Sequence, residues 1–318
     1  MLSRRDALRA IGAAGVALAA APARAAPSQP KTVPSFAVPP GACDCHVHVI
    51  GDPARYPMAA GRVYTPPQAS VDALLALQRA LHLDRVVVVQ PSIYGSDNRC
   101  MMDAVRQLGA RARGIAVIDD DVTDNDLDDM QHVGIRGVRI NLETAGDTGM
   151  SAARVKFWAA GARISGRDWH IQCYARLSVV AALKDDLGAL PVPVVLDHFG
   201  GAHADGGQPG FSALLELVRT RSVYVKLSAV NRVSMLPGYG DVAPLARALI
   251  EAGPDRMLWG SDWPHTNSAR TPGRGVEDIS PFTPVDDGVA LNLLADWAPD
   301  PTVRRQILVD NPARLYKF

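Results

Sequence analysis

The sequence predicts an α/β fold, a single (β/α)8 barrel of the TIM type. Eight short runs rich in apolar and β-branched residues recur along the chain. Segments with helical spacing separate them, and strands that alternate with helices form parallel sheets. Eight such units close into a barrel, whereas the main alternative, a doubly wound open sheet, should carry a glycine-rich phosphate loop after its first strand, and none is found.

Residues 1–25 have the pattern of a twin-arginine signal peptide. Arg4 and Arg5 precede a short apolar run from Ile11 to Ala21, and a small-residue cleavage site follows at 23–25. The run is too short to span a bilayer. We therefore expect the protein to be exported to the periplasm.

Residues 26–40 contain five prolines and are expected to form an extended arm, followed by the barrel at 41–318. Without the signal the chain has a formal charge of −3, so nothing in its charge favours nucleic acid. No later stretch resembles a membrane span. Four cysteines are few for an exported protein, which favours a core-stabilised enzyme over a disulfide scaffold, although one bridge stays possible.

The elements of the barrel follow in order. The expected strands are residues 42–49, 85–90, 114–118, 137–141, 169–174, 193–198, 223–228 and 256–262. Ser70 and Asp124 are expected to cap helices. A helix over 242–252 should end at Gly253-Pro254, and Asp300-Pro301 should begin another.

Two connections are unusually long for this fold. Residues 50–69 follow the first strand, and residues 263–284 follow the eighth. Barrel enzymes place their sites on the face where such loops lie. We therefore interpret both loops as lids.

The first strand carries the segment Asp44-Cys45-His46-Val47-His48. Residues two apart share a face of a strand, so Asp44, His46 and His48 are expected to point into the barrel mouth. By the same alternation, the cysteines are expected to pack outward against helices. This direction argues against the cysteines as metal ligands or nucleophiles.

The sixth and eighth strands also end in ionisable residues, His198 and Asp262. Each alone has an ordinary explanation, because a buried histidine is more often a hydrogen-bonded core residue. Together with His46 and His48 they occupy the ends of strands one, six and eight, which are the catalytic positions of this fold.

These motifs resemble the amidohydrolase superfamily, and within it the branch that contains 2-pyrone-4,6-dicarboxylate lactonase, sulfomuconolactone hydrolase and galactarolactone isomerase. The resemblance covers the whole chain after the signal. It rests on the opening segment at 44–48, Gln90 to Asn98, Arg136-Gly137-Val138-Arg139, Leu196-Asp197-His198 and Trp259 to His265. The motifs do not identify the substrate.

The resemblance implies a role for each of the four residues. Asp262 would act as general base on a water or move a proton, while His46, His48 and His198 polarise the attacked carbonyl. The fourth and fifth strands offer Asn141, Gln172 and Tyr174 where a two-metal centre needs a bridging Lys or Glu or a further His, so a binuclear site is not expected. One zinc held by His46, His48, His198 and Asp262, or no metal, are both left open.

Further polar residues are candidates for binding substrate. They are Gln90, Ser92, Tyr94, Asn98, Arg139, Asn141, Arg232 and His265. Arginine binds carboxylates bidentately, which favours a small anionic ligand, although Arg232 could equally form a surface salt bridge.

The leading hypothesis is hydrolysis of an anionic, carboxylate-bearing lactone. A lactone isomerase or a non-oxidative decarboxylase could use the same scaffold and the same proton transfers. A non-catalytic periplasmic binding protein is the alternative of another class, but binding alone does not need all four residues. The sequence does not predict the oligomeric state.

Overall fold

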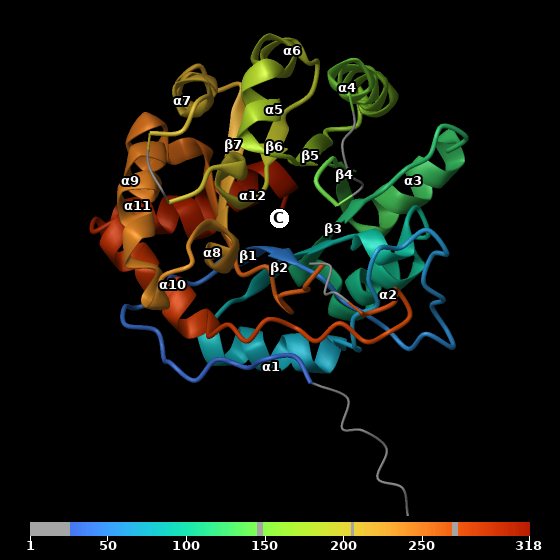
Figure 1. Cartoon of the computed structure of the whole chain (residues 1–318), viewed down its shortest axis with the longest axis horizontal. Coiled ribbons are helices and arrows are strands. Elements are labelled where there is room, and N and C mark those ends of the chain that lie inside the picture. Colours follow the sequence, from blue (N-terminus) through green and yellow to red (C-terminus); the bar gives the residue numbers. More distant parts are fainter. Residues whose placement is uncertain (1–25, 145–148, 205–206, 269–272) are drawn as a thin grey trace, which may run out of the picture.

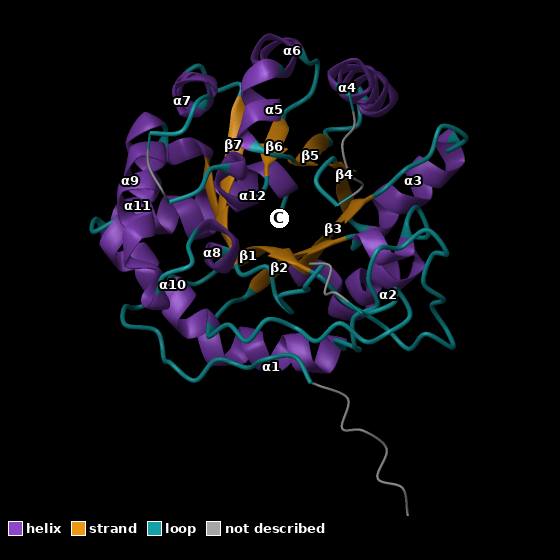
Figure 2. Ribbon diagram, viewed as in Figure 1, coloured by secondary structure: helices purple, strands orange, loops and turns teal. Residues whose placement is uncertain are grey.

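The computed structural model describes residues 26–144, 149–204, 207–268 and 273–318. The predicted signal at 1–25 lies outside these ranges. Eight parallel strands surround the centre in the order of the sequence, and helices lie around them (Figure 2). The strands are β1 Cys43–Val47, β2 Arg85–Val89, β3 Ala112–Ala116, β4 Ile135–Asn141, β5 His170–Tyr174, β6 Val194–Leu196, β7 Val223–Ser228 and β8 Met257–Gly260. Every expected strand is present, which confirms the (β/α)8 barrel.

The helices connect successive strands or follow the last one (Figure 1). The α-helices are α1 Val71–Leu81, α2 Arg99–Leu108, α3 Asp124–Val133, α4 Met150–Ile164, α5 Leu177–Ala182, α6 Lys184–Ala189, α7 Phe211–Arg219, α8 Val230–Val233, α9 Ala243–Ala252, α10 Asp287–Trp297, α11 Pro301–Arg305 and α12 Asn311–Tyr316. Shorter helical turns are η1 Ser92–Tyr94, η2 Gly109–Arg111, η3 His198–Gly201, η4 Pro237–Val242, η5 Pro254–Arg256 and η6 Gln306–Asp310. In the part of the chain that the structure describes, no helix is long and apolar enough to cross a membrane.

Local capping explains where several helices begin. The Ser70 side chain accepts a hydrogen bond from the amide of Ala73 and starts α1, as expected. Asp300 caps α11 in the same way. The cap of α3 is Thr123, one residue before the predicted Asp124, because Thr123 and Asp126 form a reciprocal capping box.

The seam between β1 and β8 closes the barrel differently from the other strand pairs. β1 and β8 form no continuous ladder. Instead the amide of Asp262 donates to the carbonyl of His46 at 2.9 Å, and the amide of His48 donates to that of Trp263 at 2.8 Å. The sheet is therefore nearly closed, and the weakly laddered seam lies next to the candidate site.

The predicted direction of the cysteines is wrong. The ladder of β1 shifts register between Asp44 and Val47, so the strand holds a bulge with one extra residue. The bulge breaks the strict alternation of side chains. Cys43 and Cys45 therefore pack in the barrel interior with Val87, Val195 and other inward residues, not outward against the helices that surround the barrel. Asp44 points to the seam with β8 and not to the mouth.

The C-terminal helix α12 closes the end of the barrel opposite the long loops. In Figure 1 the C-terminus lies at the centre of the ring of strands. Leu315 and Tyr316 are buried in one cluster with Cys43 and Cys45, and the Tyr316 ring meets His170 edge-on at 5.2 Å. All four cysteines are buried and free.

The two long loops pair with each other at the opposite end. Thr65 forms a parallel bridge with Ile279, and its hydroxyl donates to the carbonyl of Val276 at 2.6 Å. Arg62 forms an ion pair with Glu277. The predicted lids therefore form one joined cover.

The Pro-rich arm is anchored at two places. Thr32 donates from its hydroxyl to Asp286 at 2.8 Å, just before α10. The indole of Trp263 donates to the carbonyl of Ser28 at 3.1 Å. The arm therefore lies against the start of α10 and the second lid.

Candidate active site

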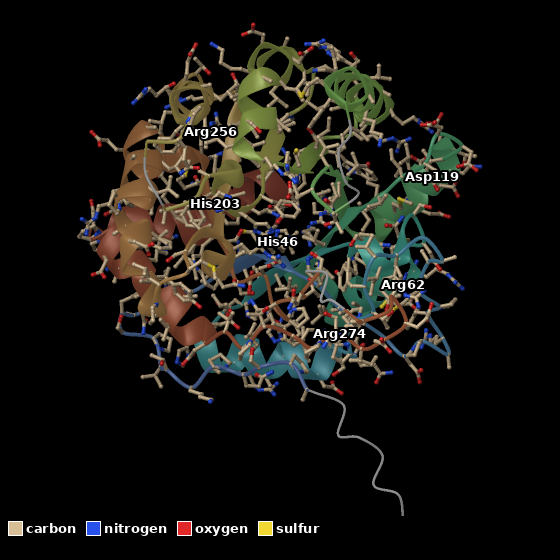
Figure 3. All side chains as sticks on the ribbon, in the orientation of Figure 1. His46, Arg62, Asp119, His203, Arg256 and Arg274 are labelled. Atoms are coloured by element: carbon tan, nitrogen blue, oxygen red, sulfur yellow. The ribbon has the colours of Figure 1, made fainter. Side chains whose placement is uncertain are left out.

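Three histidines converge on one carboxylate oxygen at the carboxyl ends of the strands. The Oδ1 atom of Asp262 lies 3.6 Å from Nε2 of His46, 3.7 Å from that of His48 and 3.8 Å from that of His198. All four side chains are buried. His46 lies near the middle of the ring of strands in Figure 3. The structure thus brings together the four residues predicted as catalytic.

Backbone geometry and neighbouring groups orient these side chains. His198 and Asp262 both have left-handed backbones, with φ of 50° and 71°, a conformation that costs free energy in a residue other than glycine. Nδ1 of His48 donates to the carbonyl of Val89 at 2.8 Å, and Nδ1 of His198 lies 2.9 Å from the hydroxyl of Ser228. Each ring therefore presents Nε2 to the centre.

A buried charged network lies directly beneath His46. Asp197 Oδ1 is 3.2 Å from Nδ1 of His46 and 3.4 Å from Nζ of Lys226. Gln172 accepts from Lys226 at 2.6 Å and donates to Asp197 at 3.0 Å. Asp197 and Lys226 were not among the predicted site residues. The sequence does hold a sign of this pair, since each residue stands in an otherwise apolar expected strand. Acidic and basic side chains are almost never fully buried unless they are paired, so the two could have been predicted to contact each other.

The surroundings of the four central residues decide which of them carry charge. Burial would raise the pKa of Asp262, but the Arg232 guanidinium holds that pKa well below its usual range. Burial, assisted by Arg139, lowers the pKa of His48 to about 4, and burial lowers that of His198 to about 4. At neutral pH the carboxylate is therefore ionised beside uncharged imidazoles.

The buried donor atoms of this cluster could hold a metal ion. Nε2 of His46 is buried and has no hydrogen-bond partner. Because Nδ1 of His48 donates to a carbonyl, its neutral ring turns a lone pair toward the carboxylate. The lone pair on Nε2 and those on the carboxylate repel one another unless a proton or a cation lies between them. Two overlapping groups could supply ligand atoms: His46, His48 and Asp262, or His46, Asp197 and His198.

A narrow pocket opens onto this centre. It is lined by His48, Tyr64, Pro91, Ser92, Arg139, Asn141, Thr144, Tyr174, His198, Arg232, Asp262, Thr266 and Ser268. The space that water centres can occupy is about 20 Å³, enough for about one water molecule. Tyr64, Thr266 and Ser268 come from the paired lids, so the lids cover the pocket.

Four of the eight predicted substrate contacts line this pocket. They are Ser92, Arg139, Asn141 and Arg232. Nε of Arg232 donates to Oδ2 of Asp262 at 2.9 Å, whereas Arg139 donates to the carbonyl of Gln90 at 3.2 Å. Two guanidinium groups therefore reach the pocket from different sides.

The other four predicted contacts lie outside the lining residues. The Gln90 side chain donates to the carbonyls of Gly95 and Asp97. The hydroxyl of Tyr94 accepts from the amide of Gly51. The side-chain amide of Asn98 donates to the carbonyl of Val117 at 2.7 Å, and Nε2 of His265 lies 3.1 Å from the carboxylate of Asp287 at the start of α10. All four make contacts that hold loops around the pocket.

Known proteins share this arrangement of sequence and fold. The family model described as Amidohydrolase matches residues 43–318. A 4-sulfomuconolactone hydrolase from Hydrogenophaga intermedia is 38% identical, over 88% of this chain and 90% of that protein. A 2-pyrone-4,6-dicarboxylate hydrolase from Comamonas testosteroni is 36% identical, over 89% and 92%.

More distant likenesses agree with these. A D-galactarolactone isomerase from Agrobacterium fabrum is 28% identical, over 90% of this chain and 94% of that protein. The crystal structure of an Agrobacterium tumefaciens protein superposes with a TM-score of 0.75 at 27% identity, covering 90% and 99% of the two chains. The barrel, the site at its carboxyl-terminal mouth and these matches lead to one conclusion: the chain is an enzyme that belongs to the amidohydrolase family.

Proposed function

We propose that the enzyme hydrolyses a small lactone that carries at least one carboxylate. The observation that carries this proposal is the convergence of three histidines on ionised Asp262 in a pocket that two arginines also line. The relatives named as lactone hydrolases support it. Arg139 and Arg232 would bind the carboxylate, because a guanidinium matches its geometry.

In the proposed reaction, Asp262 removes a proton from water as the water oxygen attacks the lactone carbonyl carbon. The negative charge that develops on the carbonyl oxygen is stabilised at the histidine cluster. The bond between the carbonyl carbon and the ring oxygen then breaks, and the ring oxygen takes the proton from Asp262. The products are a hydroxyl group and a new carboxylic acid, which releases its proton to solvent, and Asp262 is ionised again.

We further propose that His46, His48, His198 and Asp262 hold one divalent ion. Such an ion would polarise the carbonyl and lower the pKa of water. Elemental analysis of protein purified without chelators should find about one equivalent, and Asp262→Asn should retain less. Two equivalents would contradict the single-ion site, and none would contradict the proposal that an ion is bound.

A panel of pyrone, muconolactone and sugar-acid lactones tests the reaction itself. The expected result is ring opening with one oxygen from ¹⁸O-labelled water in the product. Absence of turnover across the panel would refute the proposed function.

Lactone isomerisation is the second candidate, since a D-galactarolactone isomerase is among the relatives. Asp262 and the histidines could move protons without net addition of water. An isomerised product without the ¹⁸O label would favour this candidate. The non-catalytic binding alternative is set aside, because the chain is an enzyme.

The export of the protein remains a proposal that rests on Arg4 and Arg5. Replacing both with lysine should retain the protein in the cytoplasm of the expressing cell. Cell fractionation followed by immunoblotting measures this, and unchanged periplasmic protein would contradict it.

A further inference from the structure

Asp44 belongs to the opening motif, yet it does not line the pocket. Its carboxylate is fully buried at the seam between β1 and β8. Oδ1 accepts from the amide of His46 at 3.0 Å and from that of Ser261 at 2.9 Å, while Oδ2 accepts from the hydroxyl of Ser261 at 2.5 Å. One side chain thus satisfies donors on both strands.

These bonds lie at the residues that carry the site. Asp44 accepts from the backbone amide of His46 itself, and its other partner, Ser261, directly precedes Asp262. The hydroxyl of Ser261 also accepts from the amide of Trp263 at 3.0 Å, so the backbone on both sides of Asp262 is linked to Asp44. The link matters here because β1 and β8 form no continuous ladder.

Two independent features show how tightly the seam is built. A Cβ atom on Gly260 would lie 2.9 Å from the Cβ of His46, closer than real side chains approach, so the strands meet where only glycine fits. Asp262 has a φ of 71°, a conformation that persists only where the surroundings enforce it. The bulge that turns His46 inward also begins at Asp44.

We infer that Asp44 is a positioning residue, a clasp that joins β1 to β8 and sets the distance from Asp262 to His46 and His48. It touches neither the pocket nor the reacting atoms, and it acts through Ser261 and the amide of His46. The consequence for turnover rests on the proposed function. The clasp itself does not.

Four variants test the clasp. Asp44→Ala removes all three bonds, whereas Asp44→Asn keeps an oxygen for the two amides and places its NH₂ group against the hydroxyl of Ser261. Ser261→Ala removes one arm and serves as the milder variant if Asp44→Ala does not fold. Asn311→Ala is the matched control, because buried Asn311 donates two bonds at the other end of β8, to the carbonyls of Pro254 and Met257, each at 2.8 Å.

Hydrogen exchange followed by mass spectrometry measures the local stability of the seam independently of the reaction. In Asp44→Ala, exchange should be about tenfold faster in the peptides that hold His46 and Asp262, which corresponds to the loss of about 1.4 kcal/mol of local stability. Asn311→Ala should accelerate exchange only at the start of β8 and in α12. Unchanged exchange at both seam peptides would overturn the inference, whether or not any lactone is opened.

Steady-state kinetics measures the effect of the clasp on turnover. Asp44→Ala should lower kcat about 100-fold with KM within about threefold, since misplacing a catalytic group by about 1 Å has an effect of this size. Ser261→Ala should lower kcat about tenfold, and Asp44→Asn should restore most of it. Asn311→Ala should lower the melting temperature at least as much with an unchanged kcat. The positioning role is wrong if Asn311→Ala loses as much kcat as Asp44→Ala, or if Asp44→Asn restores nothing.

Discussion

At the scale of single residues, the two carboxylate oxygens of Asp262 face different groups. Its Oδ2 is bound by Arg232 at 2.9 Å, while Oδ1 faces the three histidines and the pocket. We expect Asp262→Asn to lower kcat about 10²- to 10⁴-fold, because an amide cannot accept the proton of water. KM should change little, since Arg139 is untouched. A kcat within tenfold of the native value would assign the proton transfer to another group.

The role of Arg139 can be separated from that of Arg232. Arg139 lines the pocket but does not bind Asp262. Arg139→Met should raise KM for a carboxylate-bearing lactone roughly 10- to 100-fold, in line with the about 1.5–3 kcal/mol of a hydrogen bond to a charged group. The methyl ester of the same lactone is the control, and its KM should stay the same. Equal losses for acid and ester would indicate disrupted packing, not lost recognition.

The element scale separates what the sequence can predict from what it cannot. Buried parallel strands are continuous apolar runs, such as Val86 to Val89 in β2, and these were found without a structure. The bulge in β1 has no comparable pattern in the sequence, because one extra residue changes the direction of the side chains of Cys45 and His46 without changing the composition of the strand. Strict alternation therefore misplaced Asp44 and the cysteines while it placed His46 and His48 correctly.

Adjacent polar residues caused the remaining differences. Thr123 and Asp124 are both good caps, and only the reciprocal bond with Asp126 distinguishes them. Asp197 and His198 are consecutive residues after β6. Because successive side chains of a strand point to opposite faces, alternation predicts that only one of the two reaches the site. The left-handed backbone of His198 allows both to reach it. The sequence carried no sign of that conformation, since it favours glycine.

The paired lids should open for substrate, because the pocket beneath them holds about one water molecule. A disulfide between Thr65→Cys and Ile279→Cys would join them at the bridge that they already form. We expect the oxidised double variant to lose most of its kcat/KM and to regain it on reduction. The native cysteines are buried and free, so each single variant is a suitable control. Full activity in the oxidised form would mean that substrate enters elsewhere.

At the scale of the whole molecule, the barrel is finished differently at its two ends. The paired lids cover the mouth above the charged site, whereas α12 packs Leu315 and Tyr316 against the interior of the opposite end. Between them lie Lys226 and Asp197, fully buried. A buried ion pair seldom adds stability over apolar packing, so this pair is better explained by its contact with His46 than by folding.

His170, at the end closed by α12, should make the stability of the whole barrel depend on pH. Burial, and next the charge of Lys226, lower the pKa of His170 to about 3, whereas an unfolded histidine titrates near 6.5. Between these values the unfolded chain binds a proton that the native chain does not, so unfolding becomes easier as pH falls. The contribution of His170 is complete above about pH 6.5 and is lost toward pH 3.

His170→Phe isolates this contribution, because phenylalanine can keep the edge-on contact with Tyr316. Urea unfolding at pH 4, 5 and 6 should give a free energy that falls less steeply than in the native protein, by about 1.4 kcal/mol per pH unit. Tyr316→Phe is the control, since burial raises the pKa of Tyr316 well above its usual range and it does not titrate in this window. Its slope should match the native slope, because the hydroxyl that it removes is buried, has no hydrogen-bond partner in the described part of the chain and takes up no proton in this window. If His170→Phe also keeps the native slope, the proton taken up on acid unfolding belongs to the histidines at the mouth, and the two ends of the barrel differ in their response to acid.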